Sequence, residues 1–266
     1  MYWKDRFVYA FEYFSRPIFR TNLRDIPEQF HRRPILVFAA HPDDEIIAIG
    51  NLMYTAHVEQ GYPLVIVFAT NGAGLNWRHH RHSVSDLRMK EARDIWKSLS
   101  SKDIFIASLG YADSGLYRHF PSLLADIKYL MGKLNPVLVY THTIEGGHVD
   151  HDVTGLAVRV VRALNHYSST SFYEWAEYSK KYSLRNKTLD FVDYTANESV
   201  CRVPTQDDIS RKAAMLRMYK SQNLPSSLAE RVEVIRPISP PESAPLSFFW
   251  NGPFWYKRLQ SVRTTE

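Results

Sequence analysis

Short apolar runs alternate with longer amphipathic segments along most of the chain. Four runs rich in Ile, Leu, Val and Phe predict β-strands at residues 35–40, 64–69, 104–109 and 136–140. These runs do not alternate with polar residues, as is typical of parallel strands that are covered on both faces. Apolar positions at helical spacing follow the runs at residues 44–61, 85–99, 122–134 and 153–164. The pattern predicts an α/β fold, a Rossmann-like three-layer α/β/α arrangement with a mostly parallel, doubly wound sheet.

The regularity weakens beyond residue 168. A short strand is expected at residues 172–175 and a helix at 207–222, whereas 181–201 fits no element. Residues 237–253 are rich in proline, which predicts a loop before an aromatic C-terminal segment.

The first predicted strand ends in a polar turn with the sequence His41-Pro42-Asp43-Asp44-Glu45. Crowded carboxylates repel one another, so a fold that gathers them needs a cation or raised pKa values as compensation. The turn lies between a strand end and a helix start, which is where open α/β sheets place their ligands. These residues therefore predict half of a metal site.

A second cluster follows the fourth predicted strand. His148-Val149-Asp150-His151 lies in the same situation as the first cluster, between a strand and a helix. Two such turns in one parallel sheet can face each other at its carboxyl edge, and a catalytic zinc site usually needs three protein ligands. The residues that could supply them are His41, Asp43, Asp44, Glu45, His148, Asp150, His151 and Asp152.

Composition bears on the number of domains, the location of the protein and its partners. The 266 residues, 45% hydrophobic and 23% charged, suit one globular α/β domain with a sizeable core. One cysteine, no apolar run near about 20 residues and no signal-like apolar region predict a cytoplasmic protein. The net charge of +5 is modest and accompanies no nucleic-acid-binding module, so we expect no nucleic-acid partner.

The first 33 residues form an N-terminal extension in which aromatic side chains alternate with arginines. Phe7, Phe11 and Phe14 share a helical face. Such a helix either docks on the main domain or makes a peripheral contact with a membrane surface. We expect residues 1–33 to be this extension and residues 34–266 to form a single domain with the aromatic C-terminal segment.

Taken together, the two clusters resemble those of the PIG-L/LmbE-like zinc-dependent N-deacetylases, which include the GlcNAc-PI de-N-acetylases. The resemblance extends over roughly residues 34–222. It includes three further motifs, which are Arg88-Met89-Lys90-Glu91-Ala92, Gly110-Tyr111-Ala112-Asp113-Ser114-Gly115, and Lys212 through Tyr219-Lys220-Ser221-Gln222.

The resemblance implies a role for each matching position. It implies His41, Asp44 and His151 as ligands of Zn²⁺, or of another divalent metal, with metal-bound water as the nucleophile. Asp43 matches the general base. His148 matches the histidine that assists the tetrahedral intermediate, with Asp150 as its orienting carboxylate, and Arg88 and Asp113 match substrate-binding positions. Some members have a tyrosine where this chain has Gly146, which leaves His148 as the expected stabiliser.

The resemblance implies removal of an N-acetyl group from an amino sugar conjugate of the N-acetylglucosamine type. One alternative is a metal-dependent amidase that acts on a non-sugar amide. Another is a non-catalytic Rossmann-like binding protein, although no Gly-x-Gly-x-x-Gly follows the first strand. We expect Glu45 to be structural at a helix N-terminus, and Glu145 to be a solvated loop residue.

Overall fold

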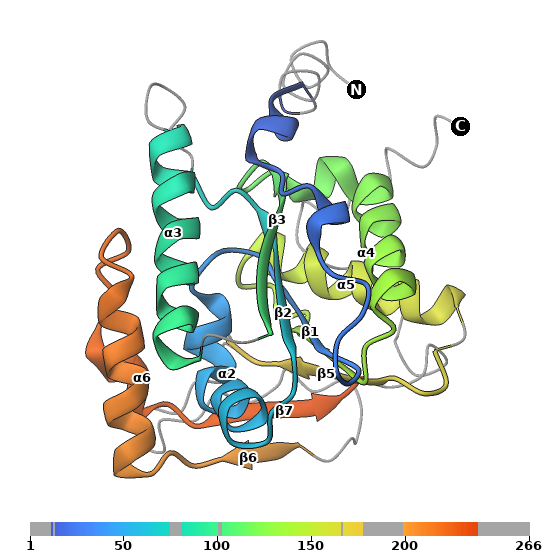
Figure 1. The fold of residues 1–266 in the computed structure, drawn as a ribbon. Helices are drawn as coiled ribbons and strands as arrows, with labels where there is room; N and C mark the ends of the chain where they lie inside the picture. Colours follow the sequence, from blue (N-terminus) through green and yellow to red (C-terminus); the bar gives the residue numbers. More distant parts are fainter. Residues whose placement is uncertain are drawn as a thin grey trace.

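Seven strands form one sheet in the order β3-β2-β1-β4-β5-β7-β6 (Figure 1). The computed structural model describes residues 12, 14–74, 81–100, 103–165, 167–177 and 199–238. The strands are β1 (Ile35–Ala39), β2 (Leu64–Thr70), β3 (Ile104–Tyr111), β4 (Leu138–His142), β5 (Ser171–Trp175), β6 (Val200–Arg202) and β7 (Glu233–Pro237). β1 to β5 are parallel, while β6 and β7 pair antiparallel at one edge. The predicted mostly parallel, doubly wound sheet is confirmed.

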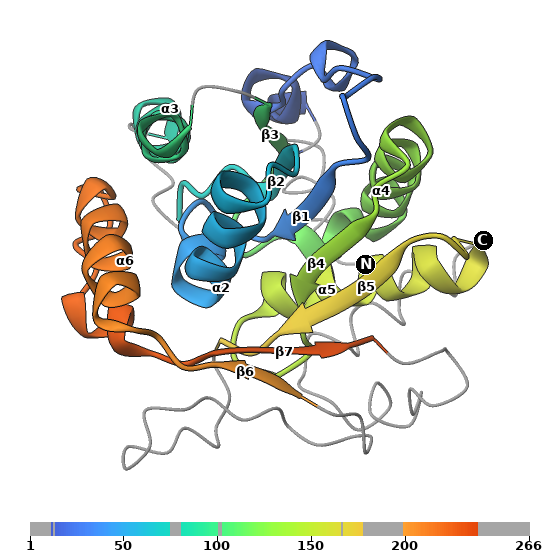
Figure 2. The same cartoon turned by 60° about the horizontal axis from the view of Figure 1, so that its bottom comes forward.

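Helices cover both faces of this sheet (Figures 1 and 2). The longer ones are α2 (Asp44–Tyr54), α3 (Arg81–Leu99), α4 (Phe120–Leu134), α5 (Val149–Leu164) and α6 (Gln206–Met218). The shorter ones are η1 (Leu23–Asp25), η2 (Thr55–Glu59), η3 (Leu116–His119) and η4 (Ser226–Glu230). α2, α3 and α6 pack on one face, and α4 and α5 on the other. The three-layer α/β/α prediction is therefore confirmed.

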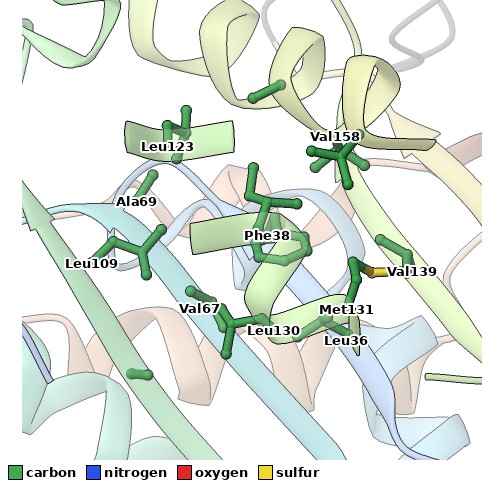
Figure 3. Packing of buried hydrophobic residues seen from close by; sticks show 14 of the residues in the cluster. Leu36, Phe38, Val67, Ala69, Leu109, Leu123, Leu130, Met131, Val139 and Val158 are labelled. Atoms are coloured by element: carbon green, nitrogen blue, oxygen red, sulfur yellow. The ribbon is translucent and has the colours of Figure 1, made fainter. Parts of the chain in front are cut away.

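Each face of the sheet has its own hydrophobic core. Leu36 and Phe38 of β1 point toward α4 and α5, where they meet Met131 and Val158 (Figure 3). The intervening residues of β1 point toward α2 and α3 on the opposite face. Because successive side chains of a strand face opposite ways, burial of both faces explains the uninterrupted apolar run.

β4 and α5 begin at other positions than the hydrophobic pattern predicts. β4 spans Leu138–His142 because it pairs in register with β1, from Ile35↔Leu138 to Phe38↔Thr141. α5 starts at Val149 rather than near residue 153, because the His148 side chain accepts a hydrogen bond from the Asp150 amide and caps the helix. The second polar cluster thus lies in the first turn of a helix.

Part of the N-terminal extension shares a core with the sheet. Residues 14–19 are helical, and Leu23 and Ile26 are buried in the core beside α4. Arg16 donates to the Leu109 carbonyl and, like Arg20, pairs with Asp126 of α4. Residues 1–11 and 13, which carry most of the predicted aromatic helix, and the C-terminal residues 239–266 lie outside the described residues. Within the described ranges, no helix is both long and apolar enough to span a bilayer.

Candidate metal centre

The two polar clusters meet where the order of strands reverses. β1 has β2 on one side and β4 on the other, and the loops after β1 and β4 carry the clusters. This reversal is the usual ligand position in a doubly wound sheet. Asp43 ends the first loop with φ 125° and ψ −31°, a strained conformation for a residue other than glycine. The Asp43 and Asp44 side chains have different partners, Arg88 and His41 respectively.

Three predicted ligand atoms lie at equal spacing around one point. His41 Nδ1 and His151 Nε2 are each 3.4 Å from Asp44 Oδ2, and the two nitrogens are 3.3 Å apart. A tetrahedral zinc ion with bonds of about 2.0–2.1 Å requires ligand atoms about 3.3–3.4 Å apart. All three side chains are buried. This donor set fits zinc.

The far nitrogen of His41 faces two carboxylates. Nε2 lies 3.3 Å from Asp150 Oδ2 and 3.5 Å from Asp113 Oδ1. Asp150 also accepts hydrogen bonds from the amides of Ser114 and Leu116, at 2.6 and 3.2 Å. Burial would raise the pKa of Asp113, but hydrogen bonding and charge from His41 hold that pKa below its usual range. The structure thus places the Asp150 and Asp113 carboxylates beside His41, a predicted ligand, rather than beside His148 or in open space.

His148 stands over the edge of His41. Their ring centroids are 4.7 Å apart at an interplanar angle of 89°. The Asp150 amide donates to His148 Nδ1 at 3.2 Å, so the proton of the neutral imidazole resides on Nε2. Burial, followed by the nearby His41 and His151, lowers the pKa of His148. These contacts favour a neutral imidazole with an Nε2–H donor.

Arg88 holds the loop that carries Asp43. Its guanidinium lies 2.9 Å from Asp43 Oδ1 and donates to the carbonyls of Gly72 and Pro42, at 2.7 and 2.6 Å. Burial raises the pKa of Asp43 to about 8 against the lowering effect of Arg88, and the Asp44 charge adds to the rise. The structure therefore places Arg88 beside the predicted base.

Two buried residues near the centre, His142 and Glu177, were not predicted from the sequence, and the burial of a third, Glu145, was predicted wrongly. His142 Nε2 lies 3.3 Å from Asp44 Oδ2, and Glu177 Oε2 lies 3.7 Å from His151 Nδ1. Glu145, expected to be solvated, is 9% exposed and accepts a 2.6 Å hydrogen bond from the Glu177 amide. That expectation is wrong because the loops after β4 and β5 close over each other. The only signal in the sequence was the polar run that follows residue 140.

Glu45 lies in the first turn of α2, as predicted, and is fully buried next to Asp43. Its carboxylate accepts from the Asp43 amide at 3.1 Å, from Trp96 Nε1 at 3.3 Å and from the Tyr219 hydroxyl at 3.0 Å. Burial raises the pKa of Glu45 to about 7, although these donors oppose the rise. Tyr219 belongs to the motif that runs from Lys212 through Gln222. Through its hydrogen bond to Glu45, this motif supports the loop that carries Asp43.

Comparison with known proteins agrees with this fold. The zinc-inhibited form of teicoplanin deacetylase Orf2 has a TM-score of 0.60 and 15% identity, over 79% of this chain and 100% of that chain. N,N'-diacetylchitobiose deacetylase from Pyrococcus horikoshii has a TM-score of 0.57 and 20% identity, over 93% and 96%. GalB, a 4-carboxy-2-hydroxymuconate hydratase from a Pseudomonas, has a TM-score of 0.55 and 15% identity, over 79% and 97%.

At these identities the solved structures establish a shared fold. No curated protein matches the sequence of this chain. The PIG-L family model, described as GlcNAc-PI de-N-acetylase, matches residues 36–162. This segment contains both polar clusters, with every predicted ligand and the predicted base. The predicted resemblance to the PIG-L family is confirmed over residues 36–162.

Proposed function

We propose that this protein is a zinc-dependent N-deacetylase that hydrolyses the acetamido group of an N-acetylated amino sugar conjugate of the N-acetylglucosamine type. The observation that carries the proposal is the equal 3.3–3.4 Å spacing of the ligand atoms of His41, Asp44 and His151. Asp43, directly beside them in the chain, is buried and paired with Arg88. The arrangement supplies a metal position and a base at one place.

Each side chain has a distinct task in this proposal. A zinc ion held by the three ligands would supply a Lewis acid for the amide carbonyl and a water with a pKa of about 7. Asp43 accepts the proton of the attacking water, and burial, which raises its pKa, makes it a stronger base than an exposed aspartate. The same proton is then available for the leaving amine. His148 donates its Nε2–H to the developing oxyanion.

The remaining predicted residues act through others. We assign Asp150 and Asp113 to the orientation of His41, since their carboxylates lie 3.3 and 3.5 Å from its Nε2. A carboxylate on the far nitrogen fixes the tautomer of a metal-binding histidine. We assign Arg88 to the positioning of Asp43, because its terminal nitrogens are already engaged by that carboxylate and by two carbonyls. These assignments replace the expected roles toward His148 and the substrate.

The family match supports an amino sugar substrate, and two of the structural neighbours are named as deacetylases. The alternative is a metal-dependent amidase for a non-sugar amide. The neighbouring hydratase belongs to the same fold, so the fold by itself does not choose the reaction. A non-catalytic binding protein would have little use for a buried base beside a ligand triad.

Metal analysis combined with acetate release tests the proposal. The substrates are a panel of N-acetylglucosaminyl compounds and a matched panel of non-sugar N-acetyl amides. Asp43→Asn should retain zinc and lose activity by about 10²–10⁴-fold, the usual range for a general base. Asp94→Asn, on the outer surface of α3 with a 46% exposed side chain, is the matched control. Acetate release that Asp43→Asn leaves unchanged would overturn the mechanism, and release from non-sugar amides alone would favour the alternative.

We also propose that the N-terminal extension, residues 1–33, contacts a membrane surface with anionic lipids. Phe14 and Ile18 are 78% and 60% exposed on one helical face. Beside them, a surface pocket of about 570 Å³ is lined by Arg16, Arg20 and Arg24 together with Tyr129. Arg16 and Arg20 pair with Asp126, whereas Arg24 is exposed. Exposed apolar side chains together with an exposed arginine suit an interface with anionic headgroups.

Vesicle co-sedimentation tests this contact. Vesicles of phosphatidylcholine with phosphatidylserine should bind the full chain more strongly than phosphatidylcholine alone. The double variant Phe14→Ser/Ile18→Ser should weaken that binding, whereas Val203→Ser, on a residue 72% exposed beyond β6, should not. Equal binding by both variants would refute the contact.

A further inference from the structure

The Glu177 carboxylate lies against the metal centre without a role in the mechanism above. Glu177 follows β5 by two residues and is 3% exposed. Its amide donates to Glu145 Oε1 at 2.6 Å, and Trp175 Nε1 donates to its Oε2 at 3.4 Å. These contacts hold the side chain in one place, so its position is defined by the fold.

Two imidazoles, tilted by 36° to each other, lie beside this carboxylate. The ring centroids of His142 and His151 are 4.0 Å apart. Their Nδ1 atoms lie 3.6 and 3.7 Å from the same oxygen, Glu177 Oε2. Their Nε2 atoms lie 3.3 and 3.4 Å from Asp44 Oδ2 on the other side. Each ring therefore spans the space between Asp44 and Glu177.

Hydrogen bonding settles which nitrogen of each ring carries the proton. The Ala40 amide donates to His142 Nε2 at 3.0 Å, so the neutral ring is protonated on Nδ1. His151 presents Nε2 to the ligand set, so its proton is also on Nδ1. Both Nδ1–H groups thus face Glu177 Oε2. The lone pair of His142 Nε2 is already used by Ala40, so His142 is not a further metal ligand.

We propose that Glu177 is the positioning residue that fixes His151 in its metal-binding tautomer. His142 packs against His151 and faces the same carboxylate oxygen. The inference rests on the proposed metal centre. His41 has a closer version of this arrangement, with Asp150 Oδ2 3.3 Å from its far nitrogen. A carboxylate in this position raises the basicity of the ligand and fixes the orientation of its ring.

Glu177 is costly to the fold without metal. Among the described residues its Oε1 is buried and has no hydrogen-bond partner. Burial of a carboxylate with one unsatisfied oxygen disfavours folding. A residue kept only for packing would be better replaced by an apolar one of similar size. Stability and metal binding should therefore respond to its replacement in opposite directions.

This opposition defines the experiment, which uses the full chain. Glu177→Gln keeps a neutral acceptor, and Glu177→Leu removes the acceptor. Zinc affinity is measured by competition with a chelator, zinc content by elemental analysis, and stability of the metal-free chain by thermal unfolding. We expect affinity to fall about 10-fold in Glu177→Gln and toward about 100-fold in Glu177→Leu. The metal-free variants should be at least as stable as the wild type.

The matched control is Glu91→Gln. Glu91 is also a buried carboxylate, but its partners are the Ser221 amide and hydroxyl, from which it accepts hydrogen bonds. It should keep the zinc affinity of the wild type and lose stability.

Three results would overturn the inference. The first is a zinc affinity of Glu177→Leu within about threefold of the wild type, well short of the loss expected for a supporting carboxylate. The second is a metal-free Glu177→Leu chain so much less stable than the wild type that unfolding alone explains its lower zinc affinity. The third is two zinc ions in the wild type and one in the variant, which would make Asp44, His142, His151 and Glu177 a second metal site. A wild-type chain without zinc affinity would instead refute the proposed function itself.

Discussion

The bend in α2 depends on a buried ion pair that the substitution Glu233→Gln should disrupt. Ile49 has φ −135° and ψ 25°, so the helical hydrogen bonding is interrupted there. The freed amides of Asn51 and Leu52 donate to the two oxygens of Glu233, each at 2.8 Å. Lys212 of α6 lies 2.9 Å from Glu233 Oε1 and balances its charge. Both side chains are at most 1% exposed.

The cost of Glu233→Gln follows from these three contacts. A glutamine has only one carbonyl oxygen to replace the two carboxylate oxygens. Its NH₂ group would therefore face either the Leu52 amide or, in the other orientation, both the Asn51 amide and Lys212, and all of these groups are donors. An unsatisfied buried donor costs about 1–3 kcal/mol. Lys212 would also remain as a buried charge without a counterion, and removing one partner of a buried pair costs about 3–5 kcal/mol. We expect a loss of about 3–5 kcal/mol in the free energy of unfolding.

Urea unfolding measures the effect. It is applied to the wild type, Glu233→Gln, Lys212→Met and the double variant Lys212→Met/Glu233→Gln. The double variant should be more stable than Glu233→Gln alone, because Lys212→Met removes the uncompensated ammonium group. Glu59→Gln, on the exposed end of η2, should change stability by no more than about 0.5 kcal/mol. A loss below about 1 kcal/mol for Glu233→Gln, or further destabilisation by Lys212→Met in its background, would refute this reasoning.

Two further predictions concern α5 and α6. A Cβ at Gly155 would lie 2.3 Å from the His142 carbonyl oxygen, so Gly155→Ala should push α5 away from β4. We expect the free energy of unfolding to fall by about 1–3 kcal/mol and zinc binding to weaken. A zinc affinity equal to that of the wild type would contradict this prediction. Burial would raise the pKa of Asp208, but the Thr205 amide, Arg211 and Arg202 lower it to about 2. Its stabilising effect is therefore present above about pH 4 and lost as pH falls toward 2. Acid unfolding should depend less steeply on pH in Asp208→Asn, and an unchanged profile would refute the assignment.

Much of the fold could be predicted because the order of apolar and polar residues indicates which positions are buried. The continuous apolar runs of β1 and β2 announce strands that are covered on both faces, and both were located within a residue. β7 was missed because its sequence, Glu-Val-Ile-Arg-Pro, mixes charges with apolar residues. Those charges are buried and paired with Lys212 and Glu174, which hydropathy does not register.

The sequence by itself determined that two polar clusters follow two predicted strands, and the family resemblance supplied the predicted ligands and base. Only the tertiary structure decided which side chains serve which. The Asp150 carboxylate lies beside His41 rather than His148, Arg88 pairs with Asp43, and Glu177 faces His151 from the loop after β5. The physical reason is that hydrogen-bond partners are selected within a few tenths of an ångström. That precision depends on strand register and helix position, which bring together residues far apart in the chain.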